Sequence, residues 1–196
     1  MSIRRSVAMG DWHGHRVFAL GHSTLDREVL LGRLLALGVV TLVDIRSYPR
    51  SRHNPQFDSD ALAAAARARG LGYAHLRALG GRRRARGGDE TNAGWRSAAF
   101  RGYADHMQTE EFAAGLHELR ALAEAGPVAI LCSEAVPWRC HRSLVADALL
   151  ARGAEVLQVI GDRVHPHRLT PFARIEGERI TYPPPEEAPA GDAVDA

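Results

Sequence analysis

Residues 39–45 read VVTLVDI, a nearly continuous apolar run that is rich in β-branched side chains. A half-buried strand alternates apolar and polar residues, whereas a strand buried on both faces of a parallel sheet does not. The run therefore predicts an inner strand of a parallel sheet. A polar segment that contains Pro49 and Pro55 follows at once, so the chain should leave the sheet in an irregular loop.

Segments on both sides of this run alternate between strand and helix patterns. Short apolar runs predict strands over 16–20, 72–76, 128–131 and 155–160. Apolar residues at helical spacing predict helices over 25–37, 59–69, 98–108, 110–125 and 141–152, the first capped by Ser23 or Thr24. We therefore expect an α/β fold: a single domain whose mainly parallel sheet of about five strands carries helices on both faces. The domain should span residues 1–182, with a short hairpin within 172–182 and a disordered, acidic, proline-rich tail over 183–196.

The composition restricts the class of protein. The 196 residues carry 25 basic and 23 acidic side chains, a balance that does not by itself indicate nucleic-acid binding. All 25 are arginine, which agrees with a GC-rich coding bias and also suits bidentate contacts to oxyanions. The apolar runs are too short to span a bilayer and the N-terminus lacks a signal-peptide pattern, so we expect a cytoplasmic protein. The only two cysteines share one short polar segment, which favours a reactive or metal-binding pair over a secretory disulfide framework.

Polar and reactive side chains gather where the predicted strands end. The carboxyl ends of parallel strands form the ligand crevice of an open α/β sheet. Four such ends supply candidates: His22 with Ser23, Asp44 with Arg46, His75, and Cys132 with Glu134. Each has a structural explanation by itself, such as a helix cap for Ser23 or a backbone anchor for Asp44. Their convergence on one edge favours a functional site.

The strongest local signal is the strand, loop and helix start over 128–143, VAILCSEAVPWRCHRS. A thiol at the end of a strand, facing a helix N-terminus and arginines, has its thiolate favoured, so Cys132 is the candidate nucleophile. Cys140, His141 and Arg142 stand where the helix begins, where free amides together with Arg142 and Arg46 could hold an anion. The alternative explanation of Cys132 is a buried, inert thiol.

Two further interpretations remain open from the residues. Cys132, Cys140 and His141, joined by His22 or Glu134, could bind zinc or iron, although the spacing of the two cysteines matches no standard zinc motif. The glycine-rich segment 77–94 could lie along a phosphate backbone, with Tyr48 or Trp95 stacking on bases; its arginines are Arg77, Arg82, Arg83, Arg84 and Arg86.

The same motifs occur together in a known family. In chain order they are Gly21-His22-Ser23, Asp44-Ile45-Arg46 with Pro49 and Ser51, the stretch from Tyr73 to Gly81, and Cys132-x-Glu134 with Cys140-His141-Arg142. In this combination the chain resembles the uncharacterised domain-of-unknown-function family 488, over residues 18–160. The resemblance implies an α/β fold and a site at these positions, but no established reaction. It also implies a histidine in the last strand, where this chain has Gln158-Val159-Ile160.

A looser likeness is to rhodanese-type sulfurtransferases and related phosphatases. It rests on the strand that ends at Asp44-Ile45-Arg46 and on a cysteine loop that leads to Arg142 and Ser143. The loop between Cys132 and Arg142 contains Pro137 and is longer than the amide-lined loop of those enzymes, so the likeness is an analogy.

Taken together, the residues predict a cysteine-dependent transferase or hydrolase that acts on a phosphate-bearing or other anionic substrate, such as a nucleotide. The catalytic candidates are Cys132, Glu134, His141, His22 and Asp44, and the candidates for anion or substrate binding are Ser23, Arg46, Ser51 and Arg142.

Overall fold

A computed structural model describes residues 11–85 and 90–185 of the chain. The main sheet has six strands: β1 (Arg16–Gly21), β2 (Thr41–Asp44), β3 (Gly72–His75), β4 (Val128–Cys132), β5 (Glu155–Ile160) and β6 (Arg163–Pro166). The α-helices of the described residues are α1 (Arg27–Ala36), α2 (Ser59–Ala68), α3 (Ala98–His106), α4 (Glu110–Ala123) and α5 (Arg142–Ala151). The predicted α/β class is confirmed, and the sheet has one strand more than expected.

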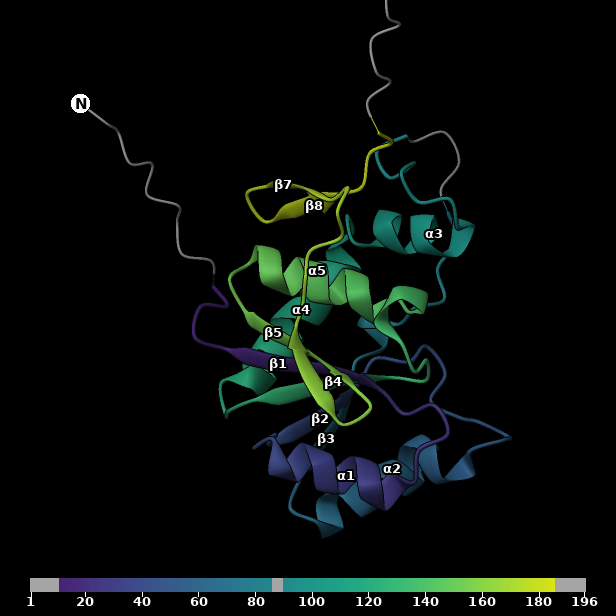
Figure 1. The fold of residues 1–196 in the computed structure, drawn as a ribbon, viewed down its shortest axis with the longest axis vertical. Coiled ribbons are helices and arrows are strands. Elements are labelled where there is room, and N and C mark those ends of the chain that lie inside the picture. The colour runs from purple at the N-terminus through teal and green to yellow at the C-terminus, as the bar shows by residue number, and fades with distance from the viewer. Residues whose placement is uncertain (1–10, 86–89, 186–196) are drawn as a thin grey trace, which may run out of the picture.

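The strands lie in the order β3-β2-β4-β1-β5-β6, and all neighbours are parallel except β5 and β6. Helix α1 leaves the end of β1 toward one face of the sheet, and α5 follows the adjacent strand β4 on the opposite face (Figure 1). Two adjacent parallel strands whose connections diverge in this way leave a crevice beyond their carboxyl ends. The ends of β1 and β4 are therefore the expected place for a ligand.

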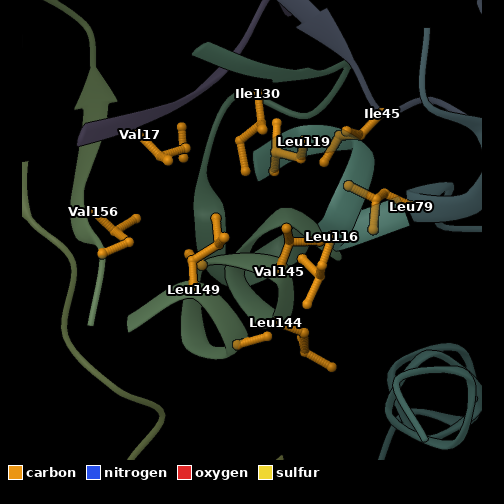
Figure 2. Close-up of a cluster of buried hydrophobic side chains, with 14 of the residues drawn as sticks. Val17, Ile45, Leu79, Leu116, Leu119, Ile130, Leu144, Val145, Leu149 and Val156 are labelled. Carbon is orange, nitrogen blue, oxygen red and sulfur yellow. The ribbon is translucent and has the colours of Figure 1, made fainter. Parts of the chain in front are cut away.

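Each face of the sheet buries its own apolar cluster. On one face, Phe18, Leu42 and Leu131 of the strands pack against Leu30 and Leu34 of α1 and Leu62 of α2. On the other face, Val17, Ile130 and Val156 pack against Leu116 and Leu119 of α4 and against α5 (Figure 2). The residues of β4 are buried throughout, which explains why its sequence shows no alternation.

The helix boundaries follow local capping. Asp26, rather than the expected Ser23 or Thr24, caps α1: its carboxylate accepts hydrogen bonds from the backbone amides of Glu28 and Val29. Ser23 adopts a left-handed backbone with φ of 45°, which takes it out of the capping position. Thr109 caps α4 by accepting from the amide of Phe112.

The chain after β5 is anchored on α5. The predicted hairpin is confirmed as β7 (Arg174–Glu176) and β8 (Arg179–Thr181), which lie over α5 in Figure 1. Asp147 of α5 is fully buried and accepts hydrogen bonds from His167, from Thr170 and from the Tyr182 hydroxyl at 2.9 Å. This carboxylate fixes the segment to the domain. Most of the predicted tail lies outside the described residues, from residue 186 onward.

Within the described ranges, no helix has the length and apolar character needed to cross a membrane.

Candidate functional site

A pocket of about 590 Å³ opens at the carboxyl ends of β1, β2 and β4. It lies where the strand connections diverge, as the topology predicts. The residues that line it include His22, Ser23, Arg46, Ser51, Arg82, Cys132, Glu134, Cys140 and His141. The fold thus brings into one cavity candidates from three of the four predicted strand ends, those of β1, β2 and β4.

Two thiols and an imidazole form the floor of the pocket. The sulfur atoms of Cys132 and Cys140 lie 3.8 and 3.7 Å from Nδ1 of His141. The other ring nitrogen, Nε2, lies 3.0 Å from the Ile45 carbonyl, which can only accept, so Nε2 carries the proton. In neutral His141 the Nδ1 lone pair therefore points toward the two sulfurs and can accept a proton from either.

The two thiols share their environment unequally. The hydrogen bond from the Cys140 thiol holds the pKa of Cys132 below that of a free cysteine, with help from His141 and against the effect of burial. The same hydrogen bond, together with burial, raises the pKa of Cys140. One proton shared between the sulfurs leaves Cys132 as the thiolate, the form that acts as a nucleophile or a metal ligand.

His141 is held in place by close backbone contacts. A Cβ built on Gly81 would lie 2.3 Å from its Nδ1, so only glycine lets this backbone cover the ring. The ring also lies 5.0 Å from the ring of Tyr103, a fully buried residue whose hydroxyl donates to the Leu79 carbonyl. These contacts fix the direction of the imidazole toward the sulfurs.

Behind the floor lies a buried layer of His22, Asp44 and Arg46. The Arg46 guanidinium makes a bidentate ion pair with Asp44 at 2.5 to 3.1 Å and donates to the Phe57 carbonyl at 2.7 Å. Its remaining nitrogen lies 3.3 Å from Nε2 of His22, and the His22 ring stacks on Phe57. Burial lowers the pKa of His22, so its ring is neutral near pH 7 and Nε2 can accept from Arg46.

Arg142 supports the loop rather than the cavity. Its side chain is fully buried and donates to the backbone carbonyls of Glu134 and Ala135. Gly21 packs against this loop so closely that a Cβ there would lie 1.6 Å from the Glu134 oxygen. The two arginines that were predicted as anion clamps, Arg46 and Arg142, thus have their guanidinium groups bonded inside the protein.

Other arginines stand at the mouth of the pocket. Arg50, Arg82 and Arg139 are exposed, line the cavity, and form no ion pair within the described part of the chain. The Arg82 guanidinium lies 5.3 Å from the ring centroid of Tyr48, which is 62% exposed. Arg82 was predicted only as part of a nucleic-acid surface, and Arg50 and Arg139 were not predicted as site residues. Neither belongs to a recognisable motif; both are simply arginines within the two candidate loops.

The remaining predicted residues have varied places. Ser51 lines the pocket, but its hydroxyl accepts from the Asn54 amide. His75 is not among the lining residues, and its ring donates to the Arg46 carbonyl. Arg83 is paired with Glu111 on α4, Arg84 is exposed outside the pocket, and Arg86 lies outside the described residues. Arg77, Arg82 and Arg83 line a second, smaller cavity beside Glu111, and a nucleic-acid surface on this loop stays a prediction.

The floor also has the composition of a metal site. The ligating atoms of Cys132, Cys140 and His141 all lie within 4.8 Å of one another. Two cysteines and one histidine with an open fourth position form a known type of zinc centre, and zinc and iron both accept these donors. The bond from His141 to the Ile45 carbonyl is the kind of support that metal-ligating histidines have. These three residues could hold such an ion.

The fold and the pocket define the chain as an α/β protein with a cysteine–histidine site at the divergence of its central strands. The chain belongs to the family described as "Domain of unknown function DUF488", which matches residues 27–149, more than half of its length. The predicted family is thereby confirmed. No curated protein and no solved structure matches the chain, and the likeness to rhodanese-type enzymes stays an analogy.

Proposed function

We propose that the chain is a cytoplasmic enzyme that acts on a phosphate-bearing or other small anionic substrate, with Cys132 as its nucleophile. The proposal is carried by one observation: a thiol that contacts an oriented imidazole lies at the floor of a pocket whose mouth has three arginines that form no ion pair among the described residues. Guanidinium groups bind phosphate and carboxylate through charge-assisted hydrogen bonds, which recommends an anionic ligand.

The arrangement supports a step of nucleophilic substitution. Nδ1 of His141 takes the thiol proton, and the Cys132 thiolate forms a bond to an electrophilic atom of the substrate. The bond to the leaving group breaks with its electron pair, and the leaving group receives the proton from His141. Water or a second acceptor then releases the bound group from the sulfur. Glu134, which is among the lining residues, is the candidate to deprotonate that acceptor.

Alkylation of Cys132 tests this proposal without a known substrate. Iodoacetamide should label Cys132 rapidly near pH 7, Cys132→Ser should lose that label, and pyrophosphate should slow the labelling of the native chain. Arg139→Ala should lose much of the protection, whereas Arg67→Ala on the exposed side of α2 should keep it. Slow labelling, or labelling that no anion slows, would contradict the proposal.

A metal centre is the second candidate, because the ligand atoms of Cys132, Cys140 and His141 converge within 4.8 Å. We propose in this case that Cys132, Cys140 and His141 would hold zinc or iron, which would supply Lewis-acid chemistry at the floor. Elemental analysis of protein purified without chelator or affinity-tag metal should then find about one ion per chain. The ion should be lost in Cys132→Ser and His141→Ala. A native protein without metal would contradict the metal centre and favour the thiolate mechanism.

A further inference from the structure

The pocket separates its positive charge from its reactive floor. The buried arginine beside the floor, Arg46, is neutralised by its ion pair with Asp44. At the mouth, Arg82 and Arg139 are exposed and form no ion pair with any residue that the structure describes. A substrate that satisfies both regions has its anionic group at the mouth and an uncharged part near Cys132.

The same mouth offers aromatic surface. Tyr48 is 62% exposed, lines the pocket and carries the Arg82 guanidinium 5.3 Å from its ring centroid. Phe100 also lines the cavity, and Trp138, which is 67% exposed and not among the lining residues, directly precedes Arg139 in the chain. Exposed aromatic rings beside guanidinium groups are the usual platform on which nucleobases stack.

The remaining polar lining suits a heterocycle. Asn54 and Glu134 are among the residues that line the cavity. Amide and carboxylate groups read the donors and acceptors on the edge of a base. A cavity of about 590 Å³ lies within the range of roughly 300–1,000 Å³ that small-molecule sites occupy.

We propose that the substrate of this site is a nucleoside phosphate, with its phosphate on Arg82 and Arg139 and its base reaching inward past Tyr48 toward Cys132. This inference rests on the proposed function and names the substrate class for it. A free nucleotide and a nucleotide within a single strand both present a base and a phosphate. The two sources differ because in the strand the phosphate is joined to further nucleotides.

Calorimetric titration of the full chain tests the inference. The probes are AMP, GMP, CMP and UMP, their nucleosides, ribose 5-phosphate, pyrophosphate and single-stranded RNA decamers. At least one nucleotide should bind about tenfold or more tightly than both its nucleoside and ribose 5-phosphate, because only the nucleotide gains stacking and ionic contacts together. A decamer that binds about tenfold tighter than every nucleotide would assign the strand as the source, and otherwise the source is the free nucleotide.

Variants at the mouth separate specific contacts from general charge. Arg139→Ala and Tyr48→Ala should each weaken the nucleotide by about tenfold, whereas Tyr48→Phe and Arg67→Ala should change it by less than about twofold. If ribose 5-phosphate or pyrophosphate binds as tightly as every nucleotide, the substrate class is refuted while the anionic-substrate proposal stands. If no phosphate compound binds, both are refuted.

Discussion

Replacing Gly21 by alanine would place a methyl group inside the loop that supports the site. Gly21 ends β1 and pairs with Cys132 of β4. A Cβ at this position would lie 1.6 Å from the Glu134 carbonyl oxygen and 2.7 Å from Nη1 of Arg142, and contacts of Cβ below 3.0 Å essentially never occur. The obstacle at 1.6 Å is backbone, so the loop must move away from the strand.

The cost has two parts. Overpacking of a tight site costs about 1–3 kcal/mol. Displacing the Glu134 carbonyl also removes one acceptor from the fully buried Arg142, and hydrogen bonds to charged groups contribute about 1.5–3 kcal/mol. We expect Gly21→Ala to lower the free energy of unfolding by about 3–5 kcal/mol, which corresponds to a fall in Tm of roughly 10 °C for a chain of this size.

Urea unfolding followed by circular dichroism measures this loss, and Gly32→Ala is the matched control. Gly32 lies within α1, and a Cβ there has no neighbour within 4 Å. Alanine at an open helical position should stabilise the chain by about 0.5–1 kcal/mol. A Gly21→Ala protein that unfolds within about 1 kcal/mol of the native chain would refute the close contact between β1 and the loop.

Three further predictions concern titration and anchoring. Cys140→Ala should shift the pH profile of Cys132 alkylation to higher pH, because it removes the thiol hydrogen bond that lowers the pKa of Cys132. Cys140→Ser keeps a hydrogen-bond donor and should shift the profile less. Equal profiles for the native chain and Cys140→Ala would contradict the sharing of one proton. The pKa of His22 is lower in the folded state than in the unfolded state, so its contribution to stability is present at pH 7 and is lost as the pH falls below about 6.5. Urea unfolding between pH 7 and 5 should therefore show a weaker pH dependence for His22→Phe, and an unchanged slope would count against this origin. Asp147→Ala should lower the free energy of unfolding by about 3–5 kcal/mol in the same assay, because it leaves several buried donors without their acceptor. Tyr182→Phe removes one hydrogen bond and should cost about 1 kcal/mol. Similar losses for the two variants would show that the carboxylate is not the centre of the network.

The fold was largely readable from the sequence because buried parallel strands leave long apolar runs. Residues 39–45 and 128–131 are such runs, and both became inner strands. The sixth strand escaped prediction because each residue of Arg163–Pro166 is exposed and its sequence has no apolar alternation. It forms through its hairpin connection to β5, which is a tertiary effect.

The sequence predicted which residues reach the site better than it predicted the hydrogen bonds that these residues form. The ends of β1, β2 and β4 were placed together by the rule for parallel sheets, which brought His22, Arg46 and Cys132 to one pocket. Residue type could not show that Arg142 bonds to the Glu134 carbonyl, since that depends on how the loop folds over the helix start. For the same reason the sequence does not show that His167 contacts Asp147 with its side chain 7% exposed.

The division between a charged mouth and a neutralised floor is tested most directly by a crystal structure of the chain soaked with pyrophosphate. We predict an anion held by at least two of the guanidinium groups of Arg50, Arg82 and Arg139, with Arg46 still paired to Asp44 and Arg142 still bonded to the loop carbonyls. An anion that replaces Asp44 on Arg46, or that binds only outside the pocket, would contradict the account.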